Sequence, residues 1–273
     1  MEKFSALLIP FLSTFLALPV LGAVDFEGFY EITAKAKHSG FLIERRETIE
    51  GGRHKHTRYL AGEGGESLAD VYVVDSAFRA VSWSSTSYKN AAVTHTAKFE
   101  FANGMVSVSN TAAGKASVTS KMQVPTDVTF DEFIPDFLKA QRGGRFVPGM
   151  RMNVVRFVEE PGISVSEVTV GPLSSLGGWK TYSIEVRPRD GETPRSYLVA
   201  DSGEVVQTKI STNKALLVSS LKEAVGANAM NAQLIEKTFG GIPKGTRVVK
   251  AAAAPVKAAA PPAKTAPARP VKK

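Results

Sequence analysis

Residues 150–210 read MRMNVVRFVEEPGISVSEVTVGPLSSLGGWKTYSIEVRPRDGETPRSYLVADSGEVVQTKI. Short apolar or alternating runs in this stretch are separated by turn-forming residues at Pro161-Gly162, Gly177-Gly178, Asp190-Gly191 and positions 201–203 (Asp-Ser-Gly). Such runs between turn residues are typical of consecutive antiparallel strands. We therefore expect a β-meander here and read the rest of the chain outward from it.

The first half of the chain has the same character. Residues 29–37 alternate between apolar and polar side chains, which predicts a half-buried strand. We expect residues 38–40 to turn the chain into a second strand at 41–50. Gly51-Gly52 then predicts a two-residue hairpin that leads into a third strand at 53–60.

The clearest hairpin lies around Asn103-Gly104, a dipeptide strongly favoured in two-residue turns. Residues 92–102 alternate before it, and the turn would place Phe101 opposite Val106 and Phe99 opposite Val108. The turn residues and the apolar pattern predict the same register, which strengthens both inferences.

Two segments have helical spacing. Phe133, Ile134, Phe137 and Leu138 predict a short helix, which Pro135 should limit to about two turns, in a connector between two β-rich halves. Asn213 can cap a helix, and apolar residues then recur at steps of four, so we expect a C-terminal helix from Asn213 to Phe239 that Gly226 bends or breaks into two pieces.

The chain divides into three parts. Residues 1–23 have Lys3, an uncharged apolar run at 4–18 and small residues up to Ala23, which is typical of a secretory signal peptide; an uncleaved membrane anchor is the alternative. Residues 24–240 form the β-rich domain. Residues 241–273 are rich in Ala, Pro and Lys and are expected to be disordered.

The amino-acid composition excludes several kinds of functional site. The chain contains no cysteine, which excludes disulfides, thiol catalysis and cysteine metal sites. The net charge of +8 belongs to the tail, where eight basic residues and no acid follow Gly240, while the domain has equal numbers of basic and acidic residues. The high pI is therefore no indication of nucleic-acid binding by the folded domain.

His54, His56 and Glu47 form one candidate site. The histidines share a face of the predicted strand, and a two-residue turn at Gly51-Gly52 would set Glu47 opposite His56. Such a trio could bind Zn²⁺ or Cu²⁺. The surrounding arginines and lysines disfavour a cation, so we favour a solvated charged hairpin with a Glu47–His56 ion pair.

Other polar candidates have structural explanations. His95 lies on the apolar face of its strand, as expected of a core histidine, and no catalytic motif accompanies it. The loop at 62–65 (Gly-Glu-Gly-Gly) lacks the spacing of a phosphate loop and a following helix, so we interpret it as a hairpin loop. Asp131, Glu132 and Asp136 could act as paired carboxylates, but they fall at a predicted helix N-terminus, where the helix dipole favours acids.

The two tryptophans, Trp83 and Trp179, could stack on a sugar or a lipid. Single tryptophans in strands are more often part of the core, so we expect both to be buried.

The chain resembles a family of uncharacterised periplasmic bacterial proteins with a layout similar to the lipoprotein carriers LolA and LolB. The likeness is carried by residues 70–75 (DVYVVD), 80–83 (AVSW), 99–106 (FEFANGMV), Gly149-Met150, 178–184 (GWKTYSI) and 197–203 (YLVADSG). It implies a strongly curved antiparallel sheet, a half-barrel or clamp open on one side, with helices against its concave face. In those carriers the concavity receives acyl chains.

These observations predict an exported, periplasmic or extracellular, mainly β, non-enzymatic protein without a cofactor or metal. It would bind a hydrophobic ligand or an envelope protein, and we expect Phe99, Phe101, Tyr182 and Ile184 to line the concavity. We expect the hollow to lie under the helix Asn213–Phe239. The alternative to a ligand site is that this helix fills the hollow as ordinary core. The alternative function is a structural protein whose basic tail contacts anionic envelope surfaces.

Overall fold

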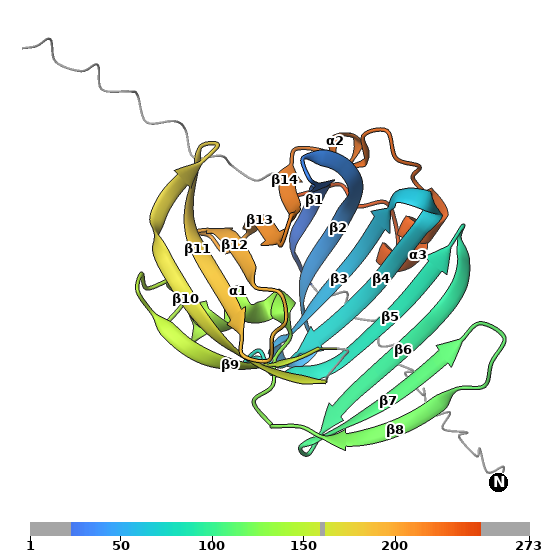
Figure 1. Ribbon diagram of the computed structural model, residues 1–273, viewed down its shortest axis with the longest axis horizontal. Coiled ribbons are helices and arrows are strands. Elements are labelled where there is room, and N and C mark those ends of the chain that lie inside the picture. The colour runs from blue at the N-terminus through green and yellow to red at the C-terminus, as the bar shows by residue number, and fades with distance from the viewer. Residues whose placement is uncertain (1–22, 159–161, 247–273) are drawn as a thin grey trace, which may run out of the picture.

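The computed structural model describes residues 23–158 and 162–246 (Figure 1). The predicted signal peptide up to residue 22 and most of the predicted tail lie outside these ranges. Within them, 14 strands form one antiparallel sheet. The strands are β1 (Ala23–Ala34), β2 (Lys37–Ile49), β3 (Arg53–Gly62), β4 (Glu66–Val74), β5 (Ala80–Lys89), β6 (Ala92–Ala102), β7 (Met105–Ala112), β8 (Val118–Gln123), β9 (Arg151–Phe157), β10 (Ile163–Leu176), β11 (Trp179–Pro188), β12 (Arg195–Ala200), β13 (Val205–Ile210) and β14 (Asn213–Val218).

The helices of the described residues are short. They are the single 3₁₀ turns η1 (Glu50–Gly52), η2 (Glu63–Gly65) and η3 (Asp131–Phe133), and the α-helices α1 (Ile134–Ala140), α2 (Leu221–Val225) and α3 (Ala232–Phe239). No helix in this part of the chain is long and apolar enough to cross a membrane.

Two meanders meet at the first strand. Strands β1 to β8 follow one another outward in one direction, β9 to β14 return from the other end, and β14 pairs with β1 so that Tyr30 lies opposite Leu217. The end strands β8 and β9 do not pair with each other, so the sheet curves without closing into a barrel (Figure 1). The predicted mainly β, curved antiparallel fold is confirmed.

The Asn103-Gly104 hairpin has the predicted register. Phe101 pairs with Val106 and Phe99 with Val108. Both turn residues have positive φ, 52° at Asn103 and 72° at Gly104, as a primed two-residue turn requires.

The predicted register of the β2–β3 hairpin is wrong by one residue. The loop contains three residues, Glu50 to Gly52, so Arg46 lies opposite His56 and Glu47 opposite Lys55. The preceding turn also differs: Lys35 and Ala36 make it with positive φ, and β2 already begins at Lys37. A shift of one residue moves a side chain to the other face of a sheet, so Glu47 and His56 lie on opposite faces.

The predicted helix from Asn213 to Phe239 is wrong in its first third. Asn213 follows a tight turn at Ser211, and β14 takes the place of a helix. Pairing with both β1 and β13 satisfies the backbone of β14, and this tertiary pairing overrides the local four-residue spacing. Helices α2 and α3 follow it, with Gly226 (φ 55°) ending α2.

The helices lie on opposite faces of the sheet. Helix α1 packs inside the curve, where Ile134 and Leu138 join a core cluster with Ile184 (Figure 1). Helices α2 and α3 pack on the outer face, where Ile235 joins Phe41 in another cluster. The expectation that the C-terminal helix covers the concave face is therefore wrong, and the connector helix occupies part of that face.

A third core cluster is aromatic. Trp83 stacks between Tyr72 and Phe99, with ring centroids 5.5 and 4.5 Å away. Trp83 is buried, as expected, whereas Trp179 at the start of β11 is half-buried.

Candidate functional site

The inner face of strands β2 to β5 is arranged in rows of directly opposed side chains. One row is apolar, and its members are Leu42, Leu60 and Leu68 on β2, β3 and β4. Leu42 and Leu68 are half-buried and Leu60 is 36% exposed. Neighbouring strands lie roughly 4.8 Å apart, so this leucine row spans about 10 Å across the inner face of the sheet.

The next row is charged. Glu44, Arg58 and Asp70 lie opposite one another one step further along the same strands. Arg58 donates hydrogen bonds to Asp70 (2.7 Å) and to Glu132 of η3 (2.5 Å). Burial opposes the charge of Arg58, but Tyr72, Glu132 and Asp70 outweigh it and raise the pKa of the guanidinium.

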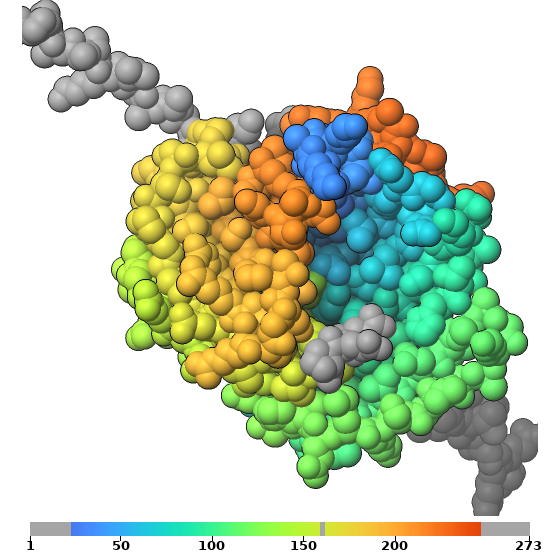
Figure 2. Space-filling view, in the orientation of Figure 1, coloured from blue at the N-terminus to red at the C-terminus, as the bar shows by residue number. Residues whose placement is uncertain are grey.

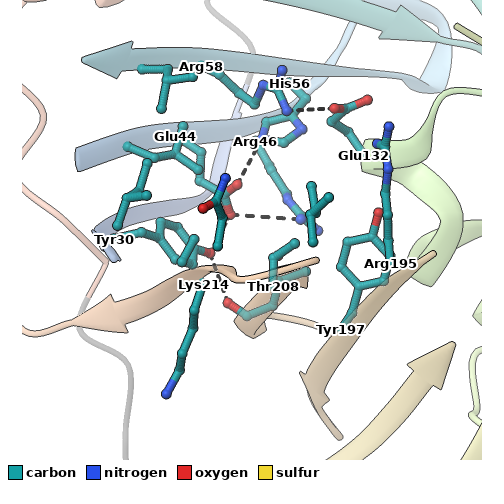
Figure 3. Close-up of a pocket in the computed structure, with 17 residues that line it drawn as sticks. Tyr30, Glu44, Arg46, His56, Arg58, Glu132, Arg195, Tyr197, Thr208 and Lys214 are labelled. Carbon is teal, nitrogen blue, oxygen red and sulfur yellow. Dashed lines mark hydrogen bonds and ion pairs between the residues drawn. The ribbon is translucent and has the colours of Figure 1, made fainter. Parts of the chain in front are cut away.

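Glu44 is the centre of a buried polar cluster. It accepts a hydrogen bond from the Tyr30 hydroxyl (2.6 Å), and His56 Nε2 lies 3.1 Å away (Figure 3). Arg46 Nη2 lies 3.8 Å from the carboxylate. Burial would raise the pKa of Glu44, but Arg46 and His56, with the hydrogen bonds from His56 and Tyr30, lower it to about 2. Glu44 is therefore ionised at neutral pH.

The connector supplies acids to arginines from both halves of the sheet. Asp136 pairs with Arg46 (3.1 Å) and Glu132 with Arg58, both from the first half. Asp131 pairs with Arg156 (2.6 Å) and with Arg195, both from the second half. The three acids do lie at a helix N-terminus, as predicted, but their main partners are these arginines.

A cavity of about 320 Å³ opens between the charged cluster and the strands of the second half (Figure 3). Its polar lining consists of Tyr30, Glu44, Arg46, His56, Arg58, Glu132, Arg195, Tyr197, Thr208 and Asn213. Its apolar lining consists of Ile32, Leu42, Leu60, Val205, Ile210 and Ala215. Lys214 also borders the cavity, but Figure 3 shows its side chain pointing away from the other residues. The cavity thus has a charged floor and an apolar wall.

A second cavity of about 620 Å³ adjoins the first, and its lining includes residues of the inner face and also Ala61 and Tyr88 of the outer-face cluster. The two share Ile32 and Leu60, and the second extends to Leu68 and Tyr88. Figure 2 shows the molecular surface hollowed between the strands of the two halves. The leucine row therefore connects two adjoining cavities.

The four residues predicted to line the concavity do not border either cavity. Phe99 and Phe101 belong to the aromatic cluster, and Phe101 contacts the ring of Phe157 at 4.9 Å. Tyr182 and Ile184 belong to the cluster around α1, with Ile184 fully buried. The structure thus divides them between two packed clusters, and their contact with a ligand stays a prediction.

The predicted trio of His54, His56 and Glu47 is not assembled. His56 pairs with Glu44, His54 stacks on Phe78 at 4.7 Å, and Glu47 pairs with Lys55 on the outer face at 2.9 Å. His56 is only 2% exposed, so the solvated hairpin expected there is wrong as well.

His95 is half-buried on the face that carries Phe99, opposite Ser87. The loop at 62–65 forms η2 between β3 and β4, as the hairpin interpretation predicted.

Sequence reasoning missed Tyr30, Glu44, Arg46, Arg58 and Arg195. A three-residue loop at 50–52 would have put Leu42 opposite Leu60 and Glu44 opposite Arg58, which is the arrangement found. This register, which pairs two leucines and sets a glutamate opposite an arginine, was the available signal.

Comparison with known proteins supports the fold. No family profile and no curated protein matches the chain. Among solved structures, it is similar to a beta-barrel-like protein of domain of unknown function DUF1849 from Brucella abortus. The TM-score is 0.51, covering 72% of this chain and 96% of that chain. The sequences are 10% identical, so the likeness concerns the fold alone.

Proposed function

We propose that the protein is an exported, non-enzymatic binding protein of the bacterial envelope that holds a small hydrophobic ligand in the two adjoining cavities. The observation that carries the proposal is the leucine row, because it lines two adjoining cavities and remains partly exposed in a folded domain. Concave, mostly apolar sites with a few convergent polar groups are typical of small-molecule binding.

The energetics favour an occupant. Complete burial of an exposed leucine side chain stabilises by about 1.5–3 kcal/mol. Because Leu42, Leu60 and Leu68 are already partly buried, a ligand that covers them gains a fraction of that amount at each. The resemblance of the sequence to the carriers LolA and LolB favours an acyl chain as one such ligand, and periplasmic location forms part of the same proposal.

The test is titration of the purified protein with a fluorescent fatty acid. We expect saturable binding that Leu60→Glu weakens at least tenfold, because a carboxylate would interrupt the apolar wall. Leu173→Glu is the matched control, since Leu173 is 48% exposed on β10 and borders neither cavity. Absence of saturable binding by the native protein would contradict the proposal.

Phe99→Asp is less suited to this test. Phe99 is 3% exposed and stacks on Trp83, so an aspartate there would lose core packing and leave a buried charge. Loss of binding in that variant would report unfolding, whereas Leu60 can be changed without emptying the core.

A second candidate function is anchoring through the basic tail. The observation that favours it is the attachment of residues 244–246 to β1. Glu27 Oε2 accepts hydrogen bonds from the backbone of Lys244 and Gly245, both 3.0 Å, and the backbone of Thr246 donates to the Glu27 carbonyl at 2.9 Å. The start of the basic segment is thus held against the folded body, as an anchor requires.

A further inference from the structure

We propose that the ligand carries an anionic head group, a carboxylate or a phosphate, and that Arg46 and Arg195 bind it at the floor of the first cavity. This inference rests on the proposed ligand-binding function and adds the chemical class of the ligand and its orientation.

The first argument is the unused hydrogen-bonding capacity of the two arginines. A guanidinium has five N–H donors. Arg46 donates to Asp136 through Nη1, and Arg195 donates to Asp131 through Nη1. Among the described residues, no hydrogen-bond acceptor is found for Nη2 of either arginine, and Glu44 at 3.8 Å from Arg46 Nη2 is too distant.

The second argument is that both groups reach the cavity. Arg46 and Arg195 line it, and their side chains are 14% and 27% exposed. Arg46 extends from β2 toward the centre of the cluster, and Arg195 lies beside Tyr197 on the facing strand (Figure 3). An anion between them would receive donors from both halves of the sheet. Guanidinium groups suit carboxylate and phosphate oxygens because they can donate two parallel hydrogen bonds.

The third argument is that the acids in the lining already have partners. Glu44 accepts from Tyr30 and pairs with His56, and Glu132 accepts from Arg58. Asp131 and Asp136 hold the arginines but do not border the cavity. The lining therefore offers spare donors, whereas its carboxylates are occupied.

The orientation of the ligand follows from the rows. Arg46 lies opposite His56, two steps from Leu42 along β2, with the charged row between them. An attached chain would therefore run from a head group at Arg46 and Arg195 past the charged row to Leu42 and Leu60. The second cavity continues toward Leu68. A single-chain amphiphile with an anionic head fits both features.

The test compares three amphiphiles with one chain length and different heads, by displacement of a fluorescent fatty acid from the full-length protein. We expect dodecanoate to bind at least tenfold more tightly than dodecanol, which corresponds to about 1.4 kcal/mol. We expect dodecyltrimethylammonium to bind most weakly. Charge-assisted hydrogen bonds are strong enough to produce such a difference.

The outcomes separate this inference from the proposed function. Equal affinity for dodecanoate and dodecanol would overturn the anionic head group and leave hydrophobic binding intact, and absence of binding by all three would overturn both. Binding of inorganic phosphate alone as tightly as dodecanoate would overturn the amphiphile in favour of a free anion.

Variants locate the head group. We expect Arg195→Gln to weaken dodecanoate binding about tenfold and to leave dodecanol unchanged, whereas Arg195→Lys should restore part of the loss. Lys214→Gln is the control. It also removes a positive charge from a residue that borders the cavity, but the side chain of Lys214 points away from the other lining residues. Equal loss for both ligands in Arg195→Gln would indicate a merely structural role and contradict the assignment.

Discussion

Glu44 keeps its negative charge in a buried position because three neighbours stabilise the ionised form. Arg46, His56 and Tyr30 together lower the pKa of its carboxyl group to about 2, against the effect of burial. A carboxyl group whose pKa is lower in the folded protein than in the unfolded chain stabilises the fold above its unfolded pKa of about 4.5. That stability is lost as the pH falls toward 2.

We therefore expect Glu44→Gln to lower the free energy of unfolding at pH 7 by on the order of 3 kcal/mol, because it leaves Arg46 and His56 without their buried partner. Urea unfolding of the native protein and the variant at pH 7, 5 and 3 measures this free energy. The native protein should lose stability between pH 5 and 3, and the variant should lose less. Glu185→Gln, an exposed change on β11, should alter stability by about 0.5 kcal/mol or less. A variant with native stability at pH 7 would contradict the geometry of the cluster.

At the scale of single strands, Gly40 and Gly62 form an informative pair. They lie directly opposite each other on β2 and β3. A Cβ atom at Gly40 would overlap the carbonyl oxygen of Ala61, whereas one at Gly62 would meet open space. Gly40 is therefore required by the close approach of two backbones.

We expect Gly40→Ala to destabilise the protein by about 1–3 kcal/mol, because the strands must move apart to accommodate the methyl group. Gly62→Ala is the matched control and should be neutral or stabilise by about 0.4–1 kcal/mol through the unfolded state. Thermal unfolding compares the two. Similar midpoints for both variants would mean that the β2–β3 spacing differs from the one described.

The Asn103-Gly104 turn allows a separate prediction. Gly104 has φ of 72°, which a β-branched residue adopts only with strain, so Gly104→Val should cost on the order of 1–3 kcal/mol. Asn103→Gly should change stability much less, since glycine also accepts positive φ. An unchanged denaturant midpoint in Gly104→Val would contradict the turn.

These elements show which parts of the structure follow from sequence. The Asn103-Gly104 register was predictable because turn and strands are adjacent in the chain. The strand conformation of β14 was not predictable in this way. The turn at Ser211 that joins it to β13 contains no glycine, and its other partner, β1, lies almost the whole domain away. Arg46 and Arg58 were interpreted as part of a solvated hairpin because charged residues are dense in this stretch. The same density occurs on an exposed strand and on a strand that faces a charged interior.

For the whole molecule, Asp131 has a special position. It pairs with Arg156, which is fully buried, and with Arg195, so it ties the connector to β9 and β12. Asp131→Asn should cost on the order of 3–5 kcal/mol, because it leaves the buried Arg156 with less compensation. Asp127→Asn, four residues earlier and exposed, is the control. Calorimetry measures both, and equal unfolding temperatures would contradict a joining role for Asp131.

The tail is tested by truncation after Thr246, which keeps the contacts of Lys244, Gly245 and Thr246 with Glu27. We expect the full-length protein to sediment with anionic vesicles and the truncated protein to remain in solution. Each basic residue near an anionic surface contributes about 1 kcal/mol, and salt screens the attraction. Equal sedimentation of both forms, or sedimentation that is independent of salt, would remove an anchoring role for the tail.

The central place of β1 has a consequence for how the chain can be made. Glu27 contacts Thr246 across 219 positions of sequence, and β14 is the neighbour of β1 in the sheet. A ribosome releases β1 first, so one edge of this strand has no partner until nearly the entire domain has emerged. Contacts of such long range slow folding, and unpaired edges associate with other chains. We therefore expect the nascent chain to depend on a chaperone during that interval more than the stability of the folded protein would suggest.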